Sequence, residues 1–396
     1  MTSATETPAA KTNPDIVEFS IVAVGVVALV LTAIFVCAAP LSGQIAGARD
    51  FVVYWATGQQ LVHHANPYDM QAMTRIERAA GLPTIYAVGY MRNPPWGLPI
   101  VLPLGLIGLR VATLFWSLLL LTCLAGSVRM LWLLHGRPKN YLYWLGLSFA
   151  PALVCLIAGQ TALFALLGLV LFLRLHGTHP FLAGMALWLC ALKPHLFVPF
   201  GLVLLTWIVL TKSYKILAGA AAAMAASCAV TYLIDPAAWP QYAQMMRTSG
   251  IEKEFIPCLS IVLRLWISPQ SNWLQYLPVS LACIWAMGYF WPRRHEWDWM
   301  KHGSLLMLVS ICLAPYCWLF DQVLAIPALL QGAYATRFRA LFVVLALASL
   351  LLEVEAASGF KLLSALHLWT APAWLAWYLI ACATPAKPRS EPLAAQ

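Results

Sequence analysis

Four polar residues stand out in this sequence because each lies at the edge of long apolar runs or between them. They are Asp50, Gln160, Lys193 and Asp321, and His195 follows the lysine by two positions. A carboxylate that is ionised near neutral pH can take a proton from a hydroxyl group. A lysine ammonium can hold an anionic group such as a phosphate, with the histidine as a helper. Ionisable groups at membrane depth cost about 2.5–3.5 kcal/mol each on insertion scales, so these residues are candidates for function.

Each of these residues also has a structural interpretation. Asp50 can pair with the adjacent Arg49 or cap the helix that follows it. The lysine can extend its ammonium to the membrane interface. Asp321 can form a salt bridge with that lysine or with Arg264, and the glutamine can serve as a hydrogen-bonding residue in a helix turn. These residue types and positions are consistent with both the functional and the structural roles.

The composition indicates that lipid surrounds most of the chain. Of its 396 residues, 62% are apolar and only 10% are charged, and the mean hydropathy is +0.77. Soluble domains carry about 25% charged residues. The net charge of +9 would suggest nucleic acid as a partner of a soluble protein, but here it reflects membrane topology. We therefore exclude nucleic-acid binding.

The apolar runs predict an all-α polytopic membrane protein with about 12 transmembrane helices. Residues 16–383 would form one transmembrane domain between a disordered cytoplasmic tail, 1–15, and a second cytoplasmic tail, 384–396. The predicted spans are 17–39, 111–134, 141–158, 161–175, 181–192, 196–210, 216–234, 273–290, 303–320, 322–334, 340–352 and 362–383.

The lysines and arginines predict the orientation of these spans. With the N-terminus inside, the cytoplasmic segments hold 14 basic and 6 acidic residues, and the other side holds 10 basic and 9 acidic residues. This excess is typical of cytoplasmic loops. Two long outer loops result, about 40–110 and 235–272, and the first contains interfacial helices. The four polar residues then all face the outer side.

Residues 93–109 are apolar but contain four prolines. A full crossing there would move Arg137 and Lys139 to the outside, so we interpret the segment as an interfacial or re-entrant helix that packs on protein. A full crossing is the main alternative.

No cofactor is predicted. The cysteines lie mostly in apolar runs, and no Cys or His cluster has the spacing of metal ligands. No GxxxxGK[ST] phosphate-binding loop is present. A metal ion held by Asp50 and Asp321 remains an alternative. A transporter or lipid flippase is a competing class, although internal repeats are lacking and the polar residues lie on one side. A structural or assembly subunit is a third possibility.

Short motifs occur in a fixed order along the chain: RDFVVYWA at 49–56, NPYD at 66–69, NPP at 93–95, GQT at 159–161, ALKP at 191–194, and APY followed by FD within 314–321. Their order resembles glycosyltransferase family 87, the integral-membrane mannosyltransferases that use polyprenyl-phosphate mannose. Cys317 departs from the pattern, because relatives often have a small or polar residue there. The sequence beyond about residue 335 matches little, which leaves the choice of acceptor open.

The resemblance implies a GT-C fold, in which a many-helix membrane body carries a long first outer loop with a catalytic acid. Asp50 matches that acid and would act as the general base in an inverting reaction, from a β-mannosyl phosphate to an α-mannoside. We assign Lys193, Arg264 and His195 to the donor phosphate. We assign six further residues to substrate binding: Arg49, Tyr54, Asn93, Gln160, Tyr316 and Asp321.

The expected partners are a polyprenyl-phosphate sugar, a glycolipid or glycan acceptor, and membrane lipids. Mannose rests on the resemblance, and arabinose or another pentose is an alternative. The expected location is a bacterial inner membrane, with the active site facing the periplasm or the exterior.

Overall fold

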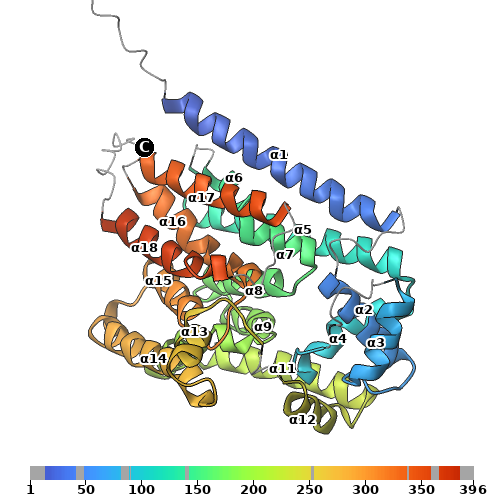
Figure 1. The fold of residues 1–396 in the computed structure, drawn as a ribbon. Coiled ribbons are helices and arrows are strands. Elements are labelled where there is room, and N and C mark those ends of the chain that lie inside the picture. The colour runs from blue at the N-terminus through green and yellow to red at the C-terminus, as the bar shows by residue number, and fades with distance from the viewer. Residues whose placement is uncertain are drawn as a thin grey trace, which may run out of the picture.

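Every regular element is a helix in the parts of the chain that the structure describes, which confirms the all-α prediction (Figure 1). This computed structural model describes residues 14–41, 49–81, 89, 91–138, 142–250, 254–336, 339–357 and 365–383. Most of the two predicted tails, 1–13 and 384–396, therefore lies outside the described residues.

The α-helices are α1 (Pro14–Leu41), α2 (Arg49–Val62), α3 (Met70–Ala79), α4 (Leu98–Val101), α5 (Leu109–Leu134), α6 (Leu142–Leu147), α7 (Ala150–Ala158), α8 (Ala162–Leu175), α9 (Pro180–Cys190), α10 (Val198–Thr211), α11 (Tyr214–Ile234), α12 (Ala238–Thr248), α13 (Leu259–Ile267), α14 (Leu277–Phe290), α15 (Trp299–Cys312), α16 (Ile326–Ala335), α17 (Arg339–Ala357) and α18 (Thr370–Ala383). Short 3-10 helices connect them: η1 (Pro95–Gly97), η2 (Leu102–Leu106), η3 (Pro194–Leu196), η5 (Asn272–Gln275), η6 (Trp291–Glu296), η7 (Leu319–Ala325) and η8 (Ala365–His367).

Among the residues that the structure describes, four helical segments are long and apolar enough to cross a membrane. They are Phe19–Ala39, Leu109–Leu134, Tyr214–Ile234 and Ala365–Ala383. Helices suit this environment because each backbone N–H and C=O group is paired within the segment. Helix α1 lies along one side of the bundle and exposes apolar side chains such as Leu31, which is 61% exposed (Figure 1). The sequence therefore folds as a membrane protein.

The other apolar helices are shorter than the roughly 20 residues that a full span needs, so the count of twelve spans stays a prediction. Two predicted spans are interrupted. Residues 148–149 separate α6 from α7, just before Pro151, and α15 ends at Cys312, before Pro315. Proline lacks a backbone N–H and disfavours helical geometry in the residue before it, which explains both interruptions.

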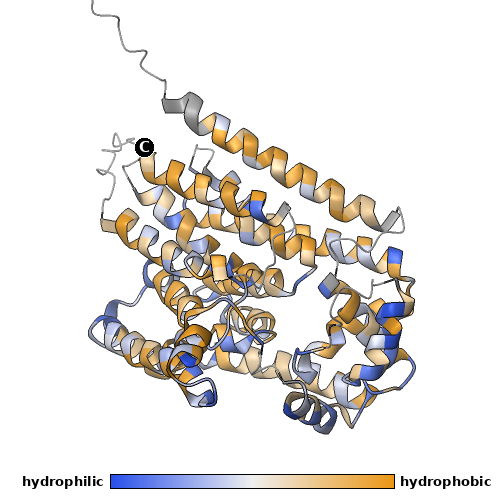
Figure 2. Ribbon diagram, in the orientation of Figure 1, coloured by the Kyte–Doolittle hydropathy of each residue, from blue (hydrophilic) through white to orange (hydrophobic). Residues whose placement is uncertain are grey.

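The helices between residues 49 and 101 lie together with α12 at one end of the molecule (Figure 1). Helices α2, α3, α4 and α12 lie toward the end of the bundle where α1 finishes, at the lower right of Figure 1. The start of α1 and the end of α18 lie on the opposite side (Figure 1). Hydrophilic residues are concentrated in α3, while α1 and α5 are mostly hydrophobic (Figure 2). The hydrophilic helix α3 thus lies at this end of a largely apolar bundle (Figure 2).

The proline-rich segment 93–109 packs on protein, as predicted. Its prolines divide it into η1, α4 and η2. Two hydroxyl groups one helical turn apart on α11 satisfy carbonyls of this broken chain: Ser227 Oγ donates to the carbonyl of Trp96 at 2.5 Å, and Thr231 Oγ1 to that of Pro95 at 2.8 Å. These bonds explain how irregular backbone is tolerated in an apolar bundle.

Helix α2 packs against η2 through two glycines. A Cβ atom at Gly105 would lie 2.1 Å from the carbonyl oxygen of Gly58, and one at Gly58 would lie 2.5 Å from the carbonyl oxygen of Val101. The side chain of Gln59 adds a hydrogen bond from Nε2 to the carbonyl of Gly105, at 2.7 Å. This close crossing fixes the position of α2, which carries Asp50.

We expect Gly105→Val to destabilise the protein by about 1–3 kcal/mol or more, because the new side chain would collide with backbone atoms of α2. The thermal unfolding midpoint in detergent measures this effect. Gly108→Ala is the matched control, since no atom lies within 4 Å of its added Cβ. Equal unfolding midpoints for the two variants would contradict the close crossing.

Candidate active site

The four polar residues that were candidates from the sequence are joined by consecutive hydrogen bonds. Gln160 Nε2 donates to Asp50 Oδ2 at 3.1 Å. Lys193 Nζ donates to Gln160 Oε1 at 2.9 Å and to Asp321 Oδ1 at 2.6 Å. We call this the polar chain: Asp50, Gln160, Lys193 and Asp321. Segments up to 271 residues apart in sequence therefore meet at one site.

Helix α2 presents Asp50 and Tyr54 one turn apart, so both side chains lie on the same face. Tyr54 is 4% exposed, and its hydroxyl donates to Gln160 Oε1 at 3.1 Å. Asp50 lies in the first turn of α2, where the helix dipole favours a negative charge. Arg49 begins this helix, but its side chain lies outside the described part, so its role in binding stays a prediction.

The turn between α7 and α8 holds Gln160 in place. Gly159 ends α7 with a φ of +72°, a left-handed conformation that glycine adopts easily. A Cβ there would lie 2.7 Å from the Cβ of Phe51 on α2. The indole Nε1 of Trp116 donates to the Gly159 carbonyl at 2.7 Å. Sequence reasoning missed Trp116, because its position in an apolar run gives no sign of this partner.

Lys193 and Asp321 form a buried ion pair. Lys193 is 8% exposed and Asp321 is fully buried. The second carboxylate oxygen of Asp321 accepts from the backbone N–H of Trp318 at 3.0 Å, and the Lys193 ammonium lies 4.7 Å from the centre of the Phe320 ring. Of the two salt bridges considered for Asp321, the structure forms the one with Lys193.

The proline-rich segment holds the backbone beside Lys193. Asn93 Nδ2 donates to the carbonyl of Leu192 at 3.3 Å, and Trp96 Nε1 donates to that of Ala191 at 2.9 Å. The Asn93 carbonyl in turn accepts from the Tyr68 hydroxyl at 3.1 Å. Asn93 therefore positions the Lys193 turn, and its role as a substrate-binding residue stays a prediction.

His195 lies against Tyr316, with ring centres 3.8 Å apart. Burial, together with the charge of Lys193, holds the pKa of His195 well below its ordinary value, so the imidazole is neutral near pH 7. Its Nε2 atom is buried and has no hydrogen-bond partner among the described residues. A buried polar atom without a partner is costly. This atom is therefore suited to bind a ligand.

Arg264 lies on a different element. It is 2% exposed on α13, where its Nη1 donates to Asn272 Oδ1 at 3.3 Å. The polar chain does not include it, so the prediction that it stands beside Lys193 as a second phosphate-binding cation receives no support from these contacts. Arg92 and Glu254, 162 residues apart in the chain, form an ion pair that the sequence did not predict.

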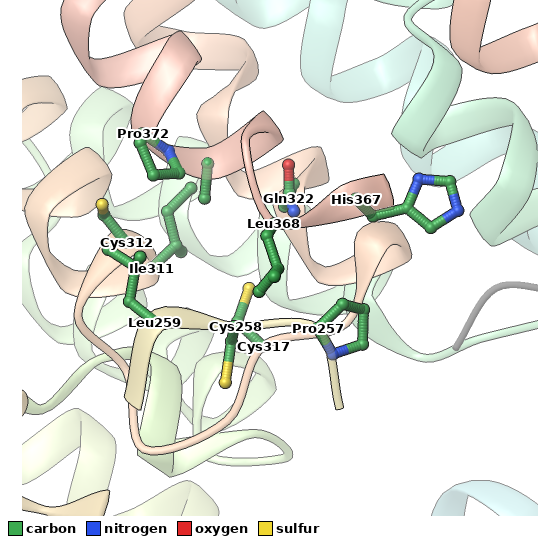
Figure 3. A pocket seen from close by; sticks show the side chains of 11 residues that line it. Pro257, Cys258, Leu259, Ile311, Cys312, Cys317, Gln322, His367, Leu368 and Pro372 are labelled. Atoms are coloured by element: carbon green, nitrogen blue, oxygen red, sulfur yellow. The ribbon is translucent and has the colours of Figure 1, made fainter. Parts of the chain in front are cut away.

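A small cavity lies between η7, α13, α15 and α18 (Figure 3). Gln322 and Cys317 line it together with His367 and Leu368. Its volume is about 10 Å³, which is the room for one water molecule. This cavity is too small for a sugar.

The described residues contain no group of three His, Cys, Asp or Glu side chains that could hold a metal ion. The expected absence of a metal cofactor stays a prediction.

The largely apolar helical bundle, in which four described helical segments are long and apolar enough to cross a membrane, defines the chain as a membrane protein. The family model of glycosyltransferase family 87 matches residues 90–315, more than half of the chain. The chain therefore belongs to glycosyltransferase family 87, as the motifs indicated, and it is a membrane glycosyltransferase. No curated protein and no solved structure matches it significantly.

The family match covers part of the polar chain. Gln160 and Lys193 lie within the matched residues, while Asp50 precedes them and Asp321 follows them. Family membership favours an enzyme over the transporter and the assembly subunit. The family match assigns no function to the individual residues of the site.

We expect Asp321→Ala to destabilise the protein by about 3–5 kcal/mol, because it leaves the Lys193 ammonium buried without its counter-ion. The double variant Lys193→Met/Asp321→Ala should lose less than the sum of the losses in Lys193→Met and Asp321→Ala. Denaturant unfolding of all four proteins measures the coupling. Strictly additive losses would contradict an energetically coupled ion pair.

Proposed function

We propose that this glycosyltransferase moves a mannosyl group from a polyprenyl-phosphate donor to a hydroxyl group of a glycan or glycolipid acceptor, with inversion. One observation carries the proposal. A carboxylate, Asp50, and a buried lysine, Lys193, are linked through a single carboxamide, that of Gln160, in a largely apolar bundle. These two groups are the minimum that the chemistry requires.

The proposed reaction is a single displacement at the anomeric carbon. Asp50 takes the proton of the acceptor hydroxyl, and the acceptor oxygen forms a new bond to the sugar. The bond from the anomeric carbon to the phosphate oxygen breaks, and its electron pair leaves with the polyprenyl phosphate. Because the donor is already activated by its phosphate, no nucleotide or other cofactor takes part.

Lys193 is suited to stabilise the departing phosphate. Its bonds to Gln160 and Asp321 use two of the three N–H groups of the ammonium. The described residues offer no further acceptor for the third N–H, which a phosphate oxygen would take. Fixed donors aimed at developing negative charge are a large source of rate enhancement. The neutral His195 would donate one further hydrogen bond.

We also propose a role for Tyr316, Tyr54 and Asp321 at the substrate. The ring of Tyr316, stacked on His195, offers an aromatic face to a sugar. Tyr54 and Asp321 hold Gln160 and Lys193 by direct hydrogen bonds, so they act on the substrate through these two residues.

The proposed arrangement in the membrane is a GT-C-like body with about 12 crossings, in a bacterial inner membrane, with the site facing the periplasm or the exterior. The distribution of basic residues along the sequence supports this orientation. The apolar side chains exposed along α1 and the shorter helices supply surfaces for membrane lipids and the isoprenoid tail.

We expect Asp50→Asn to lower sugar transfer by about 10²–10⁴-fold, because the amide cannot accept the proton. The assay is transfer of labelled mannose from synthetic polyprenyl-phosphate mannose by the purified protein, and donors with arabinose test the sugar. Asp69→Asn is the matched control, since Asp69 caps α3 and asparagine also caps helices well.

Wild-type rates for Asp50→Asn would refute the assignment of the base. Failure of the wild-type protein to transfer sugar from any lipid-phosphate donor, together with substrate uptake into vesicles, would instead indicate a transporter.

A further inference from the structure

Gln160 occupies a central place in the polar chain. Its side-chain oxygen accepts from Tyr54 at 3.1 Å and from Lys193 at 2.9 Å, and its side-chain nitrogen donates to Asp50 at 3.1 Å. A carboxamide has donors at one end and acceptors at the other. Gln160 is the one link in this chain that contacts both the carboxylate and the ammonium.

These contacts define the orientation of the amide. A lysine ammonium can only donate, so it requires the Gln160 oxygen. With the oxygen facing Lys193 and Tyr54, the NH₂ group faces Asp50. The reversed amide would bring its NH₂ group against the ammonium and its oxygen against the carboxylate, and both contacts would be repulsive. The ion pair therefore determines which atom of Gln160 reaches Asp50.

The backbone gives the amide little freedom to move. Gln160 N–H donates to the Cys155 carbonyl at 3.0 Å, and the Cys155 thiol donates to the Gln160 carbonyl at 3.3 Å. Trp116 holds the preceding residue, Gly159, through its carbonyl. Both sides of the turn are thus fixed by α5 and α7. The backbone from which the Gln160 side chain extends is therefore held in place.

We propose that Gln160 is a positioning residue, which orients the Asp50 carboxylate toward the acceptor and links it to the Lys193 ammonium at the donor phosphate. This inference rests on the proposed function, because it takes Asp50 as the base. It reassigns Gln160, which the sequence had suggested as a substrate-binding residue. Its contribution to the reaction is made through Asp50 and Lys193.

Several titratable groups face this part of the site, and they must be considered in a test by pH. They are Tyr54 from α2, Cys155 from α7, Lys193 from the turn before η3 and Asp321 from η7, and Arg49 precedes Asp50 in the chain. Two of them, Lys193 and Asp321, compensate each other's charge. Changing Gln160 therefore alters the hydrogen bonding at Asp50 while these groups stay in place.

The test is the pH dependence of kcat for sugar transfer. Gln160→Glu places a second carboxylate against Asp50 and should move the acidic limb of the profile upward by about 1 pH unit or more. Gln160→Met adds no charge but removes the N–H donor, which also raises the pKa of Asp50 and moves the limb in the same direction. In both variants kcat should fall by a larger factor than KM for the donor rises.

Gln331→Glu is the matched control. Gln331 is a half-buried glutamine on α16 whose amide is also bonded at both ends, to the carbonyl of Met300 and the hydroxyl of Tyr378. This change should leave the acidic limb where it is in the wild-type protein. If Gln160→Glu fails to fold, Gln160→Met still tests the proposal.

Lower activity with an unmoved acidic limb in both Gln160 variants would overturn the positioning role. A loss confined to KM for the donor would also overturn it, because that result indicates direct substrate binding. The proposed function fails separately, if the wild-type protein transfers no sugar from any lipid-phosphate donor.

Discussion

The buried ion pair between Lys193 and Asp321 is the interaction on which the site depends. Two charges in an apolar bundle lose their hydration, and that loss is offset only when geometry and further hydrogen bonds are good. Both conditions are met here, since Nζ and Oδ1 lie 2.6 Å apart and a backbone N–H from Trp318 reaches the other carboxylate oxygen. The pair also determines the amide orientation of Gln160, and through it the hydrogen bond to Asp50.

Irregular backbone positions these side chains. Lys193 and Asp321 both lie where helices are interrupted, next to Pro194 and after Pro315. The segment from Asn93 to Trp96 binds the carbonyls before Lys193, and α11 binds the carbonyls of that segment in turn. Proline and glycine therefore have a common role in this fold. They free backbone groups and allow close approach, and neighbouring hydroxyl and amide groups satisfy the exposed carbonyls.

The sequence predicted which residues form the site, but it did not predict the hydrogen bonds that join them. Apolar runs and the distribution of lysine and arginine brought Asp50, Gln160, Lys193 and Asp321 to one side, because hydropathy and charge are properties of the sequence itself. The individual bonds could not be predicted, since they join segments far apart in the chain. Arg264 illustrates this limit: its charge suggested a phosphate ligand, which stays a prediction, and its hydrogen bond to Asn272 could not be read from the sequence. Helix interruptions also depend on tertiary contacts, so the number of spans stays a prediction.

In the proposed reaction, the donor phosphate binds at Lys193 while the sugar faces Asp50. The most direct measurement is an electron cryomicroscopy structure of the full chain with polyprenyl phosphate bound in a lipid nanodisc. We predict a phosphate oxygen within hydrogen-bond distance of Lys193 Nζ, with His195 Nε2 as a second donor and Asp50 still bonded to Gln160. A phosphate bound elsewhere, for example at Arg264 with the Lys193 ammonium uncontacted, would contradict the account.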